Sequence, residues 1–345
     1  MSTLTQKAAL IKECWDGFKI FEATGATPEP AYLAMRQLYV QTNGWFNDIW
    51  QMLYGMSHRR RKLPPLSRSL FKTFDEAAVS KAVDSINRDG YYVFPERVPE
   101  SMLDAIYDYS LTVPASMEGE AYQEVEQKGY FDVADPKAAI YRFAQGDTID
   151  NPVAQEIMAD PVLLEIASGY FKSQASYCNV HMWWTTPYGC QTPNPRLAQQ
   201  YHFDMDRFKF LNFFLYVTDV GPEDGPHCFI RGSHKRKPSQ FLQDRRFPDE
   251  EVAGYYGPED HVEICGPRGT IMAVDGRGLH KAKMPTRGNR LIFLSSMSSS
   301  LFGQSYPRVD LKVRSDAMRA AVASDPRITC AYDVSEASEK VLARV

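Results

Sequence analysis

Apolar residues recur every three to four positions through residues 3–57, which is the spacing of one helix face. A break rich in proline and glycine at Gly25–Pro30 divides this stretch, and the same spacing continues over Ala31–Tyr54. The basic run after it, His58 to Lys62, is typical of a solvated surface linker. We therefore expect residues 1–72 to form a helical extension that acts as a lid, a docking module or a dimerisation arm.

The pattern changes after residue 72 to short apolar runs that alternate with polar residues and turns. Helices are expected at Asp75–Gly90, Pro99–Thr112 and Asn151–Ser173, and residues 235–260 read as a polar, lid-like insertion. Some eight short strands predict a mainly β core, closed or double-sheeted, of jelly-roll type. The expected strands are Tyr91–Phe94, Ile140–Phe143, Tyr177–Thr186, Phe208–Val217, His227–Ile230, Val262–Cys265, Thr270–Val274 and Leu291–Leu294.

These patterns predict a helical extension over residues 1–72, a β domain over residues 73–306 and a helical tail over residues 307–345. Hydrophobic residues make up 44% of the chain, as in globular proteins, and a net charge of −4 gives no electrostatic reason to expect nucleic acid as a partner. No apolar run is long enough to span a membrane. Six scattered cysteines without a CxxC pair suit a reducing cytoplasm, where we expect the protein to act.

Metal-binding chemistry is suggested by His202 and Asp204, which lie two positions apart in an extended stretch and so share one side of a sheet. His280 precedes another apolar run and can come from a neighbouring strand. Two histidines and one carboxylate on one face are the ligand set of non-haem Fe(II) oxygenases. A His-x-Asp pair alone arises by chance about half the time in such a chain. The aromatic surroundings of Asp204 strengthen the case, because a carboxylate buried among them needs a partner.

Further motifs follow in a fixed order. They are Tyr216–Val220 (YVTDV), Gly225-Pro226, Gly232-Ser233-His234 and Asp275–His280, with Arg290 at the start of the last strand. Together with His202-Phe-Asp204, this order resembles the phytanoyl-CoA dioxygenase family of Fe(II)/2-oxoglutarate oxygenases over roughly residues 75–305. The resemblance implies a double-stranded β-helix with Fe(II), 2-oxoglutarate and O2.

The resemblance also implies roles for individual residues. His202, Asp204 and His280 would hold the iron, and Arg290 would bind the distal carboxylate of 2-oxoglutarate, with Arg287 as a competitor for that role. Two further residues match places that touch the cosubstrate in the family, and three are candidates to contact the substrate. The cosubstrate pair is His181 and Asn212, and the substrate candidates are Trp183, Arg207 and His227.

The implied reaction is hydroxylation of an unactivated C–H bond in a small, biosynthetic molecule, with release of succinate and CO2. A carboxylate at Asp204 favours hydroxylation, because related halogenases carry a small residue there. Desaturation or cyclisation at the same iron stays open, and so does a jelly-roll protein that binds a metal or ligand without catalysis. We also expect a homodimer through the N-terminal helices as one arrangement.

Overall fold

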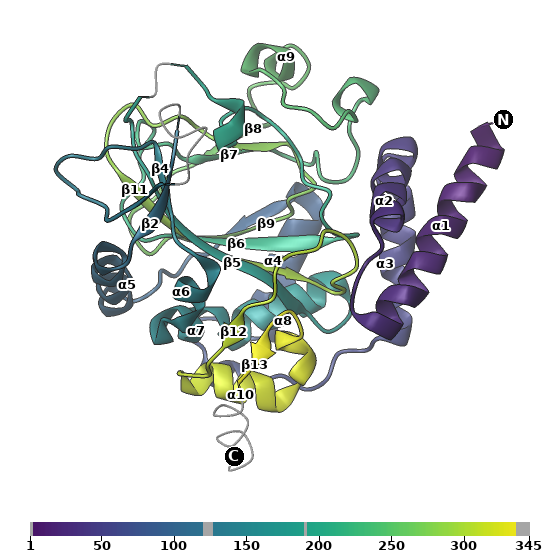
Figure 1. Ribbon diagram of the computed structural model, residues 1–345, viewed down its shortest axis with the longest axis horizontal. Coiled ribbons are helices and arrows are strands. Elements are labelled where there is room, and N and C mark those ends of the chain that lie inside the picture. Colours follow the sequence, from purple (N-terminus) through teal and green to yellow (C-terminus); the bar gives the residue numbers. More distant parts are fainter. Residues whose placement is uncertain (1–2, 120–126, 190–191, 336–345) are drawn as a thin grey trace.

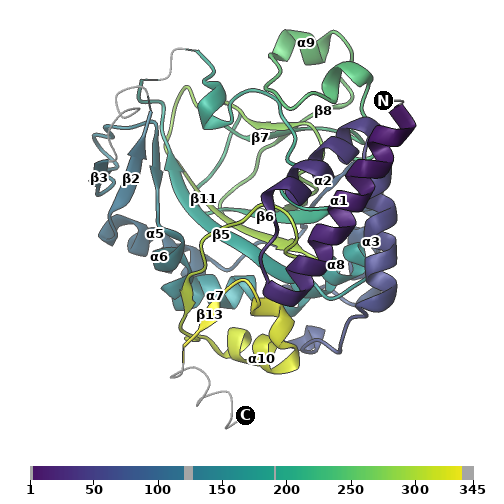
Figure 2. The same cartoon turned by 45° about the vertical axis from the view of Figure 1, so that its right-hand side comes forward.

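A computed structural model describes residues 3–119, 127–189 and 192–335. The N-terminal segment forms α1 (Thr3–Thr24), α2 (Glu29–Thr42) and α3 (Trp45–Ser57), which lie side by side along one side of the molecule (Figures 1 and 2). The prediction of continuous helix through Ala31–Tyr54 was wrong at one point. Asn43 and Gly44 both adopt positive φ, a conformation that ends α2 and lets α3 start in a new direction.

The main sheet is antiparallel and has the order β1-β9-β6-β11-β5-β4-β2-β3. Its longest strands, at the centre, match the expected runs to within a few residues. Two short strands, β2 and β3, lie where no strand was expected from the sequence, because runs of three or four residues carry too little periodicity. The strands are β1 (Tyr91–Val93), β2 (Ala115–Glu118), β3 (Gln127–Gly129), β4 (Ile140–Arg142), β5 (Ser176–Thr185), β6 (Phe210–Tyr216), β9 (Ile271–Val274) and β11 (Arg290–Ser298).

A smaller sheet has the order β10-β7-β8, formed by His280–Ala282, His227–Ile230 and His261–Ile264. Apolar side chains from both sheets join in one buried cluster, for example Phe229 of β7 with Phe214 of β6. The two sheets therefore pack face to face, as in a jelly roll. The expected mainly β core with flanking helices is confirmed.

The opposite face of the main sheet packs against helices in the largest apolar cluster of the described chain. The expected helix over Asn151–Ser173 is two helices in the structure, because Asp160 caps a new helix start and Pro161 occupies its first turn. The helices around this face are α4 (Glu76–Asp89), α5 (Glu100–Thr112), α6 (Gln145–Asp150), α7 (Pro152–Met158) and α8 (Pro161–Phe171).

The polar segment 235–260 contains a 3-10 turn and one short helix, and lies at the β7–β8 end of the molecule (Figure 1). The C-terminal tail is only partly helical, since it also forms a small parallel pair of strands. The remaining elements are η1 (Leu66–Arg68), η3 (Pro195–Leu197), η4 (Ser239–Phe241), α9 (Asp249–Ala253), β12 (Asp310–Leu311), α10 (Asp316–Ser324), η5 (Pro326–Thr329) and β13 (Asp333–Val334).

The N-terminal helices are packed onto the β core through aromatic rings. Phe208, two residues before β6, stacks on Trp50 of α3 and on Phe302, with ring centroids 4.8 and 5.2 Å away. The side-chain amide of Asn47 donates to the Phe208 carbonyl oxygen at 3.2 Å. The helices thus lie against the stretch of chain that carries His202 and Asp204.

Replacing Phe208 by alanine is expected to lower the free energy of unfolding by about 3–5 kcal/mol, because the ring is 3% exposed and its removal leaves a cavity between two aromatic neighbours. Denaturant unfolding measures the loss. Val133→Ala, outside the N-terminal helices, is the control, since Val133 is 46% exposed and its truncation should change stability by less than about 0.5 kcal/mol. Equal effects of the two substitutions would contradict the packing described here.

His234 forms part of the turn after β7, where its Nε2 lies 3.2 Å from the carbonyl oxygen of Asn87 at the end of α4. Burial lowers the pKa of His234 to about 4. An unfolded chain binds a proton at this residue near pH 6.5, whereas the folded chain does not, so stability falls as pH drops from about 6.5 toward 4. Between pH 7 and pH 5 the loss from His234 should be roughly 2 kcal/mol.

The measurement is denaturant unfolding of the wild type and of His234→Gln at both pH values. All other titrating groups are shared, so the difference between the two pH dependences isolates His234. We expect the variant to lose less stability on acidification, and identical slopes would contradict a neutral, buried His234.

Candidate metal and cosubstrate site

The three expected metal ligands come together in the structure. His202 and His280 lie opposite each other in an antiparallel bridge, with backbone hydrogen bonds of 2.9 and 2.8 Å in the two directions. Asp204 lies just beyond the bridge, and its carboxylate is 3.8 Å from Nε2 of His202 and 3.5 Å from Nε2 of His280. One donor atom from each side chain lies within 4.8 Å of the others. A single ion can therefore contact all three.

Both histidines are oriented by their other ring nitrogen. Nδ1 of His202 lies 3.0 Å from the carbonyl oxygen of Gln200, and Nδ1 of His280 lies 2.9 Å from that of Gly278. Because a carbonyl oxygen only accepts, each Nδ1 carries the proton and each Nε2 keeps a lone pair for a metal. Two imidazole nitrogens and one carboxylate fit Fe(II) with coordination positions left open.

The charges of the cluster also fit a cation. Burial lowers the pKa of His280 to about 4 and holds that of His202 well below its ordinary range, so both rings are neutral, as metal ligands must be. Burial also raises the pKa of Asp204, and the nearby Asp206 carboxylate adds to this shift. A bound divalent cation would reverse that shift by stabilising the carboxylate.

The loop before His280 is held by a buried ion pair between Asp275 and Arg277, a pairing that was not expected from the sequence. Asp275, fully buried, accepts hydrogen bonds from Nε and Nη2 of Arg277 and from the Tyr170 hydroxyl. Burial opposes the charge, but the Arg277 guanidinium outweighs it and holds the pKa of Asp275 well below its usual range. Arg277 also donates to Asp48 of α3 at 2.9 Å. The pair thus fixes the turn that presents His280 and ties it to the N-terminal helices.

Arg290 begins β11 and is 1% exposed. Its Nη2 donates to the Thr185 hydroxyl at 3.3 Å, while its Nε and Nη1 have no hydrogen-bond partner in the described chain. A buried guanidinium with free donors is costly unless an anion binds it. These orphaned donors fit the distal carboxylate of 2-oxoglutarate. Arg287, the competitor, is 72% exposed and pairs with Glu223 at 3.3 Å.

His227, expected as a substrate contact, lies on β7 with its ring centroid 5.5 Å from that of His280. The pKa of His227 is held well below the ordinary range by burial first, and the positive charge of Arg290 adds to the shift. His227 therefore lies beside the triad. Its buried Nε2 has no partner among the described residues. The position fits a contact with a bound cosubstrate at least as well as one with substrate.

A cavity of about 160 Å³ opens beside Asp204, whose side chain is 30% exposed. His181 and Asn212, expected to touch the cosubstrate, both line it, and Ser296 donates to Asn212 Oδ1 at 2.6 Å. Ser296 lies six positions along β11 from Arg290, which is about 20 Å in a strand. Asn212 therefore lies far along the sheet from Arg290 and cannot contact the distal carboxylate that Arg290 would bind.

The other two substrate candidates lie near this cavity in different ways. Arg207 lines it, is 4% exposed, donates to the carbonyl oxygens of Asp206 and Gln304, and has no partner for Nε in the described structure. Trp183 lies opposite Ile292 on β11, on the same sheet face as Arg290, with Arg142 over its ring at 5.6 Å. Arg207 is thus the better placed of the two to meet a substrate beside Asp204.

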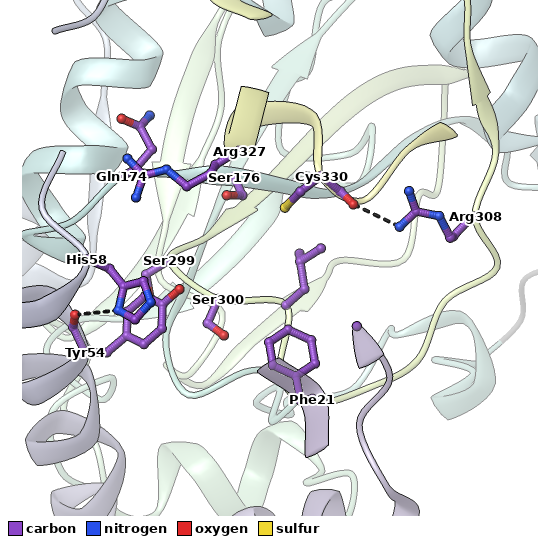
Figure 3. Close-up of a pocket in the computed structure, with 12 residues that line it drawn as sticks. Phe21, Tyr54, His58, Gln174, Ser176, Ser299, Ser300, Arg308, Arg327 and Cys330 are labelled. Atoms are coloured by element: carbon purple, nitrogen blue, oxygen red, sulfur yellow. Dashed lines mark hydrogen bonds between the residues drawn. The ribbon is translucent and has the colours of Figure 1, made fainter. Parts of the chain in front are cut away.

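A separate cavity of about 190 Å³ lies where α1 and α3 meet the C-terminal segment (Figure 3). The imidazole of His58, which lines the cavity, stacks on the ring of Tyr54 with the two centroids 3.9 Å apart. Both arginines of the cavity already form ion pairs, Arg308 with Asp333 and Arg327 with Asp325. None of the triad residues lines it. We assign no chemistry to this cavity.

No helix within the described ranges is long and apolar enough to cross a membrane. Curated protein sequences give no match to this chain. Similar solved structures include the 2-oxoglutarate-dependent epimerase SnoN from nogalamycin biosynthesis, at 14% identity, a TM-score of 0.47, and coverage of 65% of this chain and 84% of that one. The carbocyclase SnoK from nogalamycin biosynthesis has 15% identity and a TM-score of 0.45, with coverage of 66% of this chain and 84% of that one. EctD from S. alaskensis has 18% identity and a TM-score of 0.46, with coverage of 72% of this chain and 88% of that one.

The sequence also matches a family model, and this match covers more than half of the chain. The model is described as phytanoyl-CoA dioxygenase (PhyH), and it spans residues 86–288. The matched range contains His202, Asp204 and His280, and ends just before Arg290. The resemblance noted from the sequence motifs is thereby confirmed, and this chain belongs to the phytanoyl-CoA dioxygenase family of iron- and 2-oxoglutarate-dependent oxygenases.

Proposed function

We propose that the protein is an Fe(II)- and 2-oxoglutarate-dependent dioxygenase that hydroxylates an unactivated C–H bond of a small, biosynthetic molecule. The observation that carries this proposal is the convergence of two free Nε2 atoms and the Asp204 carboxylate. The orphaned guanidinium of Arg290, on the inner face of the same core, supplies the second requirement, an anchor for the cosubstrate.

Each side chain has a distinct role in this proposal. His202, Asp204 and His280 would hold the iron, with coordination positions left for 2-oxoglutarate and O2. Arg290 binds the distal carboxylate of 2-oxoglutarate and so orients its oxo-acid end toward the triad. The substrate enters the cavity beside Asp204, where Arg207 provides polar contact.

Iron, 2-oxoglutarate and O2 together supply the oxidising chemistry. One atom of O2 enters the product hydroxyl, and the other enters succinate as 2-oxoglutarate loses CO2, so atoms and electrons balance. The protein's own contribution is positioning, and the two sheets bury the cosubstrate site, which limits access of water to it. A carboxylate ligand at Asp204 supports hydroxylation rather than halide transfer.

The test is incubation of the Fe(II)-loaded protein with 2-oxoglutarate, ¹⁸O2 and a panel of metabolites, followed by mass spectrometry of succinate and of each metabolite. We expect ¹⁸O in succinate and one added ¹⁸O in a product. A product that has lost two hydrogens without gaining oxygen would replace hydroxylation by desaturation or ring formation. No succinate above the level of an Asp204→Ala variant would overturn the oxygenase proposal and favour a binding protein.

Cytoplasmic location and self-association through the N-terminal helices are also proposals. Nine of the fourteen exposed large hydrophobic side chains of the described chain lie on α1, α2 and α3, and Trp45 and Met56 are among the most exposed. Such clustering supports contact with a second copy. Sedimentation velocity of the wild type and of Met56→Ser tests this, and we expect a dimer that the variant weakens. A wild-type monomer at every concentration would contradict it.

A further inference from the structure

Arg246, in the 235–260 insertion, lies next to the metal cluster although no motif marked it in the sequence. Tyr201 and Phe247 form an antiparallel bridge, with backbone hydrogen bonds of 3.1 and 2.8 Å. In such a pair the next residues along, His202 and Arg246, face each other and point to the same side. Because His202 also bridges to His280, three neighbouring segments place the side chains of Arg246, His202 and His280 on one side.

The guanidinium of Arg246 has no hydrogen bond or ion pair within the described ranges. It is half-buried, and burial lowers its pKa, which is the response of a cation without a close counter-ion. The carboxylates that act on it are those of Asp204 and Asp244. An unpaired arginine held away from bulk water needs an anionic partner.

Neither of these carboxylates is free to fill that need in the working protein. Asp204 would be neutralised by iron, and Asp244 pairs with Arg36 of α2. The Arg36–Asp244 pair joins α2 to the insertion, and Arg36 also donates to the Tyr32 hydroxyl at 2.7 Å within α2. Once iron is bound, neither of these two carboxylates is left to compensate the charge of Arg246, which favours an anion from outside.

We propose that Arg246 binds a carboxylate or phosphate group of the primary substrate, and that the substrate is therefore an anionic small molecule. This inference rests on the proposed function. The two arginines then bind different molecules. Arg290 lies deep in the core and binds the cosubstrate. Arg246 lies across His202 from His280, on the segment that pairs with Tyr201, and binds the substrate. Planar, bidentate donors make arginine well suited to either anion.

The test uses the Fe(II)·2-oxoglutarate complex without O2, whose visible charge-transfer band responds to binding near the iron. Acetate and inorganic phosphate are the probes, and acetamide is the neutral control. The variants are Arg246→Gln and Arg246→Lys, with Arg245→Gln as the matched control, because Arg245 is adjacent but pairs with Glu251 on the outside. Thermal unfolding confirms that all variants are folded.

We expect one anion to shift the band saturably in the wild type and in Arg245→Gln, and its identity to separate a carboxylate substrate from a phosphate one. Arg246→Gln should lower the affinity for that anion at least about tenfold, and Arg246→Lys should keep most of the wild-type affinity. Equal shifts by acetamide, no shift by either anion, or wild-type affinity in Arg246→Gln would overturn the proposal. Loss of the 2-oxoglutarate band in Arg246→Gln would also overturn it by assigning Arg246 to the cosubstrate.

A wild type with no charge-transfer band at all would be a different failure. It would remove the proposed iron and cosubstrate chemistry itself. The band before any probe is added therefore reports on the proposed function, and the shift after the probe is added reports on Arg246.

Discussion

Replacing His280 by alanine is expected to abolish the charge-transfer band that Fe(II) and 2-oxoglutarate give in the wild type. His280 would supply one of two nitrogen donors in the proposed site, and no other described histidine, cysteine or carboxylate joins the cluster. Loss of groups that merely orient a ligand costs 10- to 100-fold in metal affinity, so loss of a ligand itself should cost more than about 100-fold. Anaerobic titration of the metal-free protein with Fe(II), followed by visible absorption, measures the effect.

His58→Ala is the matched control, because it also removes an imidazole, but one that stacks on Tyr54 and does not belong to the metal cluster. It should keep the full band. His280 is also 7% exposed and bridges to His202, so far-ultraviolet circular dichroism must show that the variant is folded. A folded His280→Ala protein that binds iron with wild-type affinity would rule out this metal site.

Replacing Arg290 by methionine is expected to leave iron binding intact but to weaken 2-oxoglutarate by roughly 100-fold. Removing one partner of a buried, hydrogen-bonded charge pair costs about 2–5 kcal/mol, which is consistent with this factor. In the absence of cosubstrate the same change should not destabilise the protein, since it removes a buried guanidinium with two unpaired donors. Band intensity against 2-oxoglutarate concentration measures the first effect, and thermal unfolding measures the second.

Arg287→Met separates the two arginines that the sequence left as competitors. Arg287 is 72% exposed and paired with Glu223, so its loss should leave cosubstrate affinity within about twofold. If Arg287→Met weakened 2-oxoglutarate and Arg290→Met did not, the assignment of the cosubstrate anchor would be reversed.

Much of the site could be predicted because its residues are close in sequence or belong to recognisable strands. His202 and Asp204 are two positions apart, and alternation along an extended chain places them on one side even though regular strand ends at the bridge. The apolar runs of β5, β6 and β11 are long enough for their period to be read. Short elements such as β2 and β10 are too brief to carry a period, so their existence depended on the neighbours with which they pair.

Long-range electrostatic partners could not be read from the sequence in the same way. Asp48 and Arg277 are 229 positions apart, and their contact exists only because α3 lies against the loop before His280. Likewise Arg246 stands in a segment that reads as a polar insertion, and only the bridge between Tyr201 and Phe247 brings it beside His202. Charged residues of this kind resemble any solvated surface charge until the fold gives them neighbours.

The sequence alone was sufficient for the family and the mainly β core, and it singled out the three candidate metal ligands that the structure brings together, because periodicity and motif order are local properties of the chain. The tertiary structure decided which arginine faces the core, since Arg287 and Arg290 differ in burial and pairing rather than in kind. It also decided which ring nitrogens are free, through carbonyl oxygens of Gln200 and Gly278 that no pattern marks. Hydrogen bonding and burial depend on neighbours in space, and the order of residues along the chain does not fix those neighbours.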